Sequence, residues 1–562
     1  MVSVRIVRWS AAPASPPPRC ARFQPASAYS LALKQLVLAL LLALCAPCAA
    51  VAGGLDWLDR LLPHWLRHEI DTQICTVGDP AAPEARQTVA SLQEVVVAPQ
   101  KRAWEAALGG QAAARPAIRA RLAGWPHRLL IDRATLPPGD AAFLLRLARD
   151  TWRGLDAFTD RDNGLPIDNV RFVPEPTDPS AIADARVGDY TSPTNIGLHL
   201  IATVAAADLQ LLPPAEATAK IERLLDTLAR LETFHGFFFN YYDTTSLERT
   251  SNFVSFVDSS WLTAGLMVVR ATFPALAARC TSLIAQTDYR FFYNPHSERV
   301  SHGYYVNRAQ RSPFDYGMLY TEARLGILLA IGKGDLPADA WFDLVRTFPA
   351  ACTWQSLTPR AARPKAVAGH RVWAGDYEWE GMRYVPSWGG SMFEALMPTL
   401  VLDEQQYAPR SLGANDRAYA LVQQRYAMEH LGYPVWGLSS CATPAVDGYA
   451  EYGVKVLGAR GYEAGPVASY AAALALAAVP DMAVANLRTL ATRYDVYGEY
   501  GFYDAVDPRT GQVAYEYLAL DQSMLFIALA NHLTHGRLQQ RFASDPIAQR
   551  FLPTIGEENF FE

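Results

Sequence analysis

Two aromatic-rich segments carry the carboxyl groups whose chemistry is easiest to interpret. Residues 371–394 alternate tryptophan and tyrosine with four acids, Asp376, Glu378, Glu380 and Glu394. Residues 497–507 repeat the pattern with Glu499, Asp504 and Asp507. Flat rings beside hydrogen-bond acceptors suit a sugar, and acetal cleavage requires two carboxyl groups. The pattern favours a carbohydrate-cleaving site without metal or cofactor; the alternative is that the rings pack helix ends and the acids are solvated.

The composition indicates a globular protein, and the charge argues against a polyanionic ligand. The chain has 562 residues, of which 50% are hydrophobic and 11% aromatic, which excludes disordered and fibrous classes. It carries 50 Lys+Arg against 56 Asp+Glu, a net charge of −6. Because residues 1–52 hold five of the basic residues and no acid, their removal would leave −11. We therefore expect no nucleic-acid partner, while neutral small molecules and neutral glycans remain open. Together with the sugar-like pattern of residues 371–394, this favours an oligo- or polysaccharide substrate.

The first 52 residues are typical of an export signal. Basic residues precede an apolar run of 11 residues, 36–46, and a small-residue cleavage site ends at Ala52. The run is short for a membrane span. A lipoprotein signal at Cys45 or Cys48 and an uncleaved anchor are the alternatives. We expect a periplasmic or secreted protein whose mature chain has no integral membrane domain.

Cysteines and histidines do not indicate a metal or thiol site. Four cysteines follow residue 52, widely spaced and without a CxxC motif, so at most two disulfides are expected. The 11 histidines form no HExxH or HxH cluster. The sequence therefore predicts no metal and no cofactor.

Helical periodicity dominates the chain from residue 140 onward. Apolar side chains follow the i, i+3, i+4 rule in residues 143–155 and 221–231. Further helices are expected at 194–209, 256–272, 318–332, 390–402, 415–430, 466–478 and 518–534. No βαβ alternation or phosphate loop is present, so we expect an all-α fold, either a closed ring of helical pairs or a solenoid.

The Pro-Pro-Gly sequence at 137–139 is a helix breaker that suggests a domain boundary. We expect a signal peptide over 1–52, a helical accessory region over 53–135 and a catalytic domain over 136–562.

Five segments, in chain order, resemble the glycoamylase-like domain of cyclic β-1,2-glucan synthases and of related bacterial endo-β-1,2-glucanases. They are DTWRGLDAFTDRDNGLPIDNV (150–170), TSPTNIGLHLIATVAAADL (191–209), HGFFFNYYDTTSLERTSNFVSFVDSSWLTAG (235–265), YTEARLGILLAIGKGDLPADAWF (320–342) and SWGGSMFEALMP (387–398). Further on, YGEYGFYDAVD and YLALDQSM resemble the endoglucanase branch. The resemblance covers roughly 140–540 and implies an (α/α)6 toroid that acts on β-glucan.

Three acids match positions that carry carboxylates in that family. The resemblance implies a catalytic or substrate-gripping role for Glu322 in the TEAR motif. It implies a similar role for Asp258 at a predicted helix start, where an N-cap is the alternative. Glu394 matches the MFE glutamate, which would contact the sugar or orient a catalytic group.

One departure affects the expected mechanism. Ser440 occupies the position where the synthase domain has the second catalytic glutamate of its WGISE motif. The stretch SNFVSFVD also lacks the extra acid of the endoglucanase branch, which leaves Asp447 and Glu451 as reserve candidates. Serine is a poor substitute for a nucleophilic carboxylate, which disfavours a retaining reaction through this position and leaves an inverting one open. For the latter we expect Glu322 as acid and Asp258 or Glu394 as base.

Seven further residues are candidates for sugar contacts, although helix-end packing or capping would explain each of them equally well. The aromatic candidates for stacking are Trp388, Trp436, Tyr384 and Tyr503. The polar candidates for hydroxyl contacts are Asp504, Asp521 and Gln522.

We expect an exported glycoside hydrolase that acts on a β-glucan, by preference β-1,2-linked. A transglycosylase that remodels the same glucan is the first alternative. Because Ser440 interrupts the known motif, a non-catalytic glycan-binding envelope protein is the second.

Overall fold

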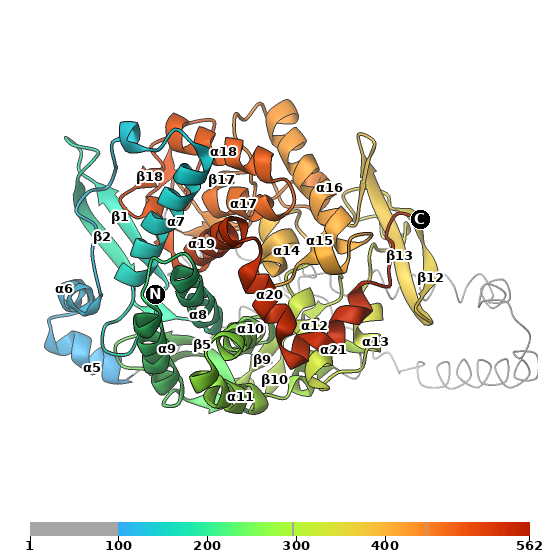
Figure 1. Cartoon of the computed structure of the whole chain (residues 1–562), viewed down its shortest axis with the longest axis horizontal. Coiled ribbons are helices and arrows are strands. Elements are labelled where there is room, and N and C mark those ends of the chain that lie inside the picture. The colour runs from blue at the N-terminus through green and yellow to red at the C-terminus, as the bar shows by residue number, and fades with distance from the viewer. Residues whose placement is uncertain (1–98, 295–296, 447) are drawn as a thin grey trace, which may run out of the picture. The chain divides into compact units, whose positions relative to one another are not determined.

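The computed structural model describes residues 99–294, 297–446 and 448–562, which belong to one compact unit that begins at Ile74 (Figure 1). The predicted signal peptide and most of the predicted accessory region lie outside the described residues. Within the described part of the chain, no helix is long and apolar enough to span a bilayer.

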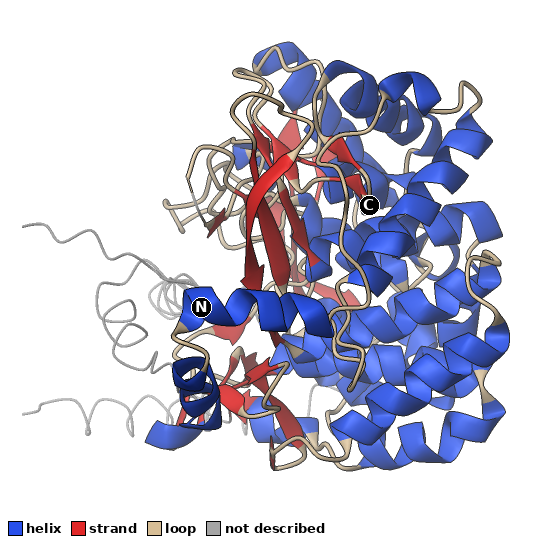
Figure 2. Ribbon diagram, turned by 90° about the vertical axis from the view of Figure 1, so that its left-hand side faces the viewer, coloured by secondary structure: helices blue, strands red, loops and turns tan. Residues whose placement is uncertain are grey.

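The predicted all-α (α/α)6 toroid is wrong. Helices make up 46% of the structure, but strands make up 20% and form seven antiparallel sheets in the described residues, so the fold is mixed α/β. In Figure 2 the strands and long loops gather on one side of the helices. Many of these strands are only two or three residues long, too short for their alternation to show in the sequence.

The helical layer is built around α8 (Pro193–Asp208), α10 (Phe256–Thr272) and α19 (Ala519–Thr534). Helix α8 packs against both others, and α19 also contacts α7 (Asp140–Ala157) and α17 (Ser469–Leu474). Helix α10 contacts α12 (Arg324–Lys333), which packs on α21 (Pro546–Ile555). Almost every side chain of α8 is buried, which explains why it is apolar on all sides.

Ten further α-helices occur in the described residues. They are α5 (Pro99–Ala107), α6 (Gln111–Arg121), α9 (Pro214–Leu228), α11 (Ala277–Ala285), α13 (Asp339–Phe342), α14 (Met392–Leu396), α15 (Glu404–Tyr407), α16 (Leu412–Arg425), α18 (Pro480–Arg493) and α20 (Arg537–Ser544).

Most of the expected helices are present, with instructive differences. The expected helix 256–272 coincides with α10. The expected helix 318–332 begins only at Arg324, because Met318 pairs with Val345 in a β-bridge and residues 321–323 form a turn. The expected helix 390–402 divides into α14 and a 3-10 helix, Met397–Leu400, which has Pro398 in its first turn.

Three sheets contain the longer strands. Strands β5 (Phe237–Asp243) and β6 (Arg249–Ser255) pair in a sheet with β3 (Tyr190–Thr191), β4 (Thr233–Phe234), β9 (Gly303–Tyr305) and β10 (Gln310–Arg311). Strand β1 (Asn169–Pro174) lies between β2 (Ile182–Gly188) and β22 (Glu516–Leu518). Strand β13 (His370–Trp379) lies between β12 (Arg360–Val367) and β14 (Met382–Tyr384).

Four small sheets consist of two- and three-residue strands. They are β7 (Tyr293–Asn294), β8 (Arg299–Ser301) and β11 (Asp315–Tyr316); β15 (Cys441–Ala442) and β16 (Tyr449–Ala450); β17 (Val467–Ala468), β20 (Ala505–Val506) and β21 (Val513–Ala514); and β18 (Tyr497–Gly498) and β19 (Gly501–Phe502).

Candidate active site

A large cavity lies among the strands and loops that precede α12, α14 and α19. Its volume is about 980 Å³, enough for several sugar rings. Four carboxylates line it: Asp315, Glu322, Glu394 and Glu451. Seven aromatic side chains line it as well: Phe314, Tyr316, Phe348, Trp388, Phe393, Tyr449 and Tyr462. The cavity thus combines the two ingredients that the sequence suggested for a sugar site.

Glu322 occupies the turn immediately before α12 and lines the cavity. Burial raises its pKa to about 8, and the negative charges of Glu394 and Glu451 add to this effect. The positive charge of Arg324 and a backbone hydrogen bond oppose it. A carboxyl group with this pKa is protonated at neutral pH and can donate a proton to a leaving oxygen.

Glu394 lies at the start of α14, where its carboxylate forms a capping box with Ser391. It accepts hydrogen bonds from the backbone N–H groups of Gly389 and Ser391 at 2.9–3.1 Å. The hydroxyls of Ser387 and Ser391 donate to it at 3.0 and 2.8 Å. Burial raises its pKa, while these donors lower it. Glu394 is therefore held rigidly beside Glu322.

Glu451 and Ser440 belong to another wall of the same cavity. Glu451 is exposed and hydrogen-bonds with the hydroxyl of Tyr462, which also lines the cavity. Burial and then the charges of Glu394, Glu451 and Glu322 raise the pKa of Tyr462. This hydroxyl consequently lies in the field of all three glutamates. Ser440 lines the cavity where the synthase family has its second glutamate; the other reserve candidate, Asp447, lies outside the described residues.

Asp258 lies in the first turn of α10 rather than in the cavity wall. Its carboxylate accepts a hydrogen bond of 2.7 Å from the Thr194 hydroxyl, and its own N–H donates to the N-cap Ser255. Burial and the charges of Glu322 and Asp258 raise the pKa of Tyr316. Tyr316 lines the cavity and thus connects Asp258 to the Glu322 side of the site.

The four predicted stacking residues divide between cavity and core. Trp388 lines the cavity, with its ring 5.7 Å from that of Trp354. Tyr384 is fully buried and donates to the Val456 carbonyl. Tyr503 is also fully buried, and its ring stacks on Tyr517 at 4.5 Å. Trp436 is 2% exposed, with its backbone bonded to the Asn486 amide. Of these four, the structure places only Trp388 at the cavity.

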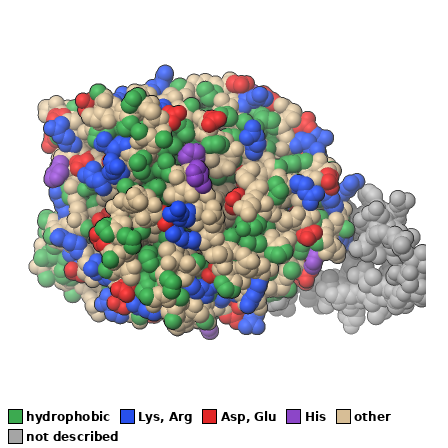
Figure 3. Space-filling model, viewed as in Figure 1, with side chains coloured by type: hydrophobic (Ala, Val, Ile, Leu, Met, Phe, Trp, Pro, Cys, Tyr) green, Lys and Arg blue, Asp and Glu red, His purple; other side chains and the backbone are tan. Residues whose placement is uncertain are grey.

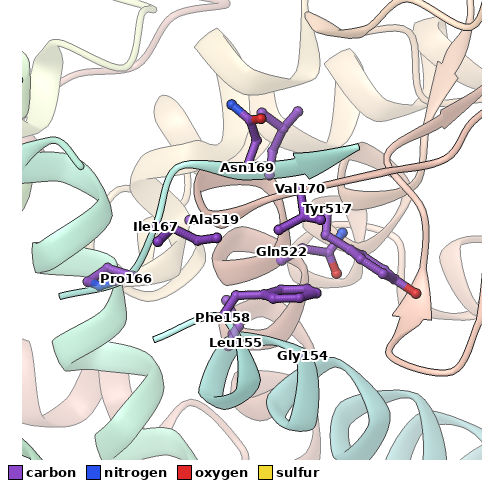
Figure 4. A pocket seen from close by; sticks show the side chains of 11 residues that line it. Gly154, Leu155, Phe158, Pro166, Ile167, Asn169, Val170, Tyr517, Ala519 and Gln522 are labelled. Carbon is purple, nitrogen blue, oxygen red and sulfur yellow. The ribbon is translucent and has the colours of Figure 1, made fainter. Parts of the chain in front are cut away.

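The three predicted hydroxyl-binding residues are buried near the start of α19. Burial raises the pKa of Asp504 to about 6, and burial with the neighbouring Asp504 charge raises that of Asp521 well above its usual range. Gln522 lines a small pocket of about 20 Å³ with Leu155 and Phe158 (Figure 4), which has room for no more than a water molecule. None of the three lines the large cavity.

Several cavity residues were not identified from the sequence. His302 contacts Tyr316, with ring centroids 4.2 Å apart, and burial lowers the pKa of His302 to about 4. Tyr316, Tyr449 and Tyr462 also line the cavity. No motif distinguished these tyrosines from the many that pack in the core. The YTEAR segment marked Glu322 but gave no indication of the distant residues that surround it.

Family models match two parts of the chain. Residues 360–546 match the family described as Glycoamylase, "Putative glucoamylase". Residues 146–316 match a family of unknown function, DUF3131. The resemblance to glycoamylase-like proteins is confirmed. The glycoamylase-like match spans Glu394, Ser440 and Glu451, whereas Glu322 lies between the two matched regions.

One curated relative is a cyclic β-(1,2)-glucan synthase of Rhizobium meliloti (strain 1021). It is 26% identical in an alignment of 556 residues that covers 72% of this chain and 18% of the relative. This chain thus spans about a fifth of that protein's length.

Solved structures share the fold. A putative glucoamylase from Bacteroides caccae is 21% identical, with a TM-score of 0.58 over 74% of this chain and 99% of the other. An endo-β-1,2-glucanase from Chitinophaga pinensis, solved with sophorotriose and glucose, is 17% identical, with a TM-score of 0.59 over 75% and 99%. These matches show that the chain shares the fold of these proteins.

Proposed function

We propose that this protein is a glycoside hydrolase that cleaves β-1,2-glucan. The observation that carries this proposal is the meeting of Glu322 with Glu394 and Glu451 around one aromatic-lined cavity of about 980 Å³. The cyclic synthase relative and the endoglucanase with its bound sophorotriose support the β-1,2 linkage. Residues 136–562 would form the catalytic domain and residues 53–135 an accessory region.

Glu322 is the general acid in this proposal. Its carboxyl proton passes to the glycosidic oxygen as the bond between that oxygen and the anomeric carbon breaks. A water molecule supplies the new hydroxyl at the anomeric carbon, and a second carboxylate accepts the proton that this water loses. The pKa of about 8 keeps Glu322 protonated at neutral pH.

Three carboxylates compete for the role of base. Glu394 is already bound by five hydrogen bonds from Ser387, Gly389 and Ser391, so we assign it to fixing the geometry and field of Glu322. Glu451 is exposed in the cavity wall and is our first choice as base. Asp258 would have to act through Tyr316, which makes it the second choice.

Sugar binding is assigned to the cavity aromatics. Trp388, which was expected to stack on a sugar, lines the cavity with Tyr449 and Tyr462. Rings of this kind offer flat apolar surfaces to the CH faces of glucose. The face seen in Figure 3, which is the helical side of the molecule, mixes basic and acidic side chains without a continuous patch of one sign.

Export of the protein remains part of the proposal. The signal-like sequence of residues 1–52 supports a periplasmic or secreted location. Cys352 is disulfide-bonded, as expected in an oxidising compartment, whereas Cys280 and Cys441 are free and buried.

Transglycosylation is the second candidate because the curated relative is a glucan synthase. The two reactions differ in what attacks the anomeric carbon: water in hydrolysis and a sugar hydroxyl in transfer. Incubation with linear β-1,2-glucan separates them by chromatography of the products. Shorter chains with new reducing ends are expected for hydrolysis, longer or cyclic chains would indicate transfer, and an unchanged substrate would leave a glycan-binding protein.

A further inference from the structure

Arg324 is fully buried and follows Glu322 by two residues, yet its guanidinium turns toward Glu404. Its Nε and Nη2 atoms donate to the two carboxylate oxygens of Glu404 at 2.8 and 2.9 Å. Glu404 is 1% exposed. The ring of Tyr320 lies 4.8 Å from the guanidinium carbon, and the Tyr320 hydroxyl donates to Asp416 at 2.7 Å. The cation is therefore fixed in position from several sides.

The remaining hydrogen bonds of Arg324 reach the two backbone segments that carry Glu322 and Glu394. Its Nη1 donates to the carbonyl of Thr321 at 3.0 Å, in the turn that holds Glu322. The same Nη1 donates to the carbonyl of Glu394 at 3.2 Å, and Nη2 donates to that of Ala395 at 2.5 Å. A single planar group thus connects both segments.

We propose that Arg324 is a positioning residue that sets the separation between Glu322 and Glu394, an inference that rests on the proposed function. The two glutamates are far apart in the chain, one in the turn before α12 and the other in the first turn of α14, so local structure does not fix their distance. The planar guanidinium of Arg324 fixes this distance, because it donates hydrogen bonds to carbonyls of both segments while its ion pair with Glu404 keeps it in place. Arg324 itself touches no substrate.

The separation has a chemical consequence that can be measured. The charge of Glu394 contributes to the raised pKa of Glu322, and this contribution falls as the two carboxylates move apart. Lysine at position 324 would keep the positive charge but could not bridge Thr321, Glu394 and Ala395 with a fixed fork. Arg324→Lys should therefore lower the pKa of Glu322 through geometry alone.

The test compares Arg324→Lys with wild type and with a matched control, Arg270→Lys. Arg270 forms a bidentate pair with Asp545 at 2.8 and 2.6 Å, in the last turn of α10 and away from the cavity. For Arg324→Lys we expect a fall in kcat of about tenfold or more, with KM changed less than about threefold. The alkaline limb of the pH–rate profile should move to lower pH. Arg270→Lys should keep the wild-type profile and the wild-type ratio of kcat to KM.

Hydrogen exchange provides a readout that does not require turnover. In Arg324→Lys, exchange should rise together in residues 321–325 and 394–398, whereas in Arg270→Lys both segments should keep wild-type rates. If Arg324→Lys does not fold, Glu404→Gln, which removes the charge that holds the guanidinium, takes its place with the same expectations.

Two results would overturn the positioning role: wild-type exchange and pH profile in the Arg324 or Glu404 variant, or the same changes in Arg270→Lys. Failure of the proposed function would look different, because wild type itself would not cleave β-1,2-glucan while the exchange result would still decide the bridging role.

Discussion

At the scale of single residues, the chemistry depends on how differently the cavity treats its carboxylates. Burial and negative neighbours raise the pKa of Glu322 to about 8. Glu394 is surrounded by donors from Ser387, Gly389 and Ser391. Glu451 is exposed. Acids in such different environments have different pKa values, so one can donate a proton while another accepts one.

Removing the acid should remove the reaction. Glu322→Gln keeps the shape of the side chain but carries no transferable proton, so kcat on β-1,2-glucan should fall by about 10³-fold. Reducing-end release measures this loss. The control is Glu463→Gln, since Glu463 is an exposed acid paired with Lys455 and is not part of the cavity wall. Full activity of Glu322→Gln would exclude Glu322 as the acid.

The pH dependence follows from the same carboxyl group. The active form carries the proton, so kcat/KM should be retained below the pKa of about 8 and should decline as the pH rises through it. Initial rates measured between pH 5 and pH 10 would locate this decline, the alkaline limb of the pH–rate profile. An alkaline limb near pH 5 would mean that Glu322 has an ordinary pKa and is not the proton donor.

At this scale the sequence could not predict which candidate side chains are buried in the core and which line the cavity. The TEAR and MFE motifs identified Glu322 and Glu394, which the cavity brings together. Trp388 and Trp436 looked alike as stacking candidates, but Trp436 is buried in the core. An aromatic residue that packs and one that faces a sugar have the same side chain, so only the fold separates them.

At the scale of elements, helices were predictable and strands were not. The apolar repeats that define α7 and α9 are read directly from the sequence, because a helix repeats every 3.6 residues. Strands such as β11 and β15 are two residues long, too short to show alternation. β11 pairs with β8 and β15 with β16, and the two residues of such a strand do not reveal the partner.

The start of α14 should be sensitive to its cap. Ser391→Ala removes both the N-cap acceptor for the Glu394 N–H and a donor to the Glu394 carboxylate, so the free energy of unfolding should fall by about 1 kcal/mol. Urea unfolding measures the change. Ser411→Ala is the control, because Ser411 is the N-cap residue of α16 but its side chain makes no capping hydrogen bond. Equal effects of both substitutions would contradict this view of the cap.

The crossing of α8 and α10 should not tolerate a methyl group. A Cβ on Gly265 would lie 2.4 Å from the Gly197 carbonyl oxygen, so Gly265→Ala should destabilise the protein by about 1–3 kcal/mol. Thermal unfolding checks this. Gly139→Ala meets nothing within 4 Å and should leave stability nearly unchanged. Wild-type stability of Gly265→Ala would show that the two helices are further apart than described.

At the scale of the whole molecule, a layer of packed helices forms the core, and a face of strands and loops forms the cavity. Figure 2 shows the two on opposite sides. Helices α8, α10 and α19 pack closely and contribute few groups to the cavity, while turns at helix starts bring Glu322 and Glu394 to it. The helices were predicted from local periodicity, but the cavity could not be, because it assembles segments from residue 299 to residue 520.

The most direct test of the account is the action of the purified protein on a panel of linear β-glucans of defined length, with β-1,2-, β-1,3- and β-1,4-linkages, followed by chromatography of the products. The account predicts that wild type shortens the β-1,2-glucan and generates new reducing ends, and that Glu322→Gln does not. Absence of any new product from β-1,2-glucan, or equal cleavage by Glu322→Gln, would contradict it.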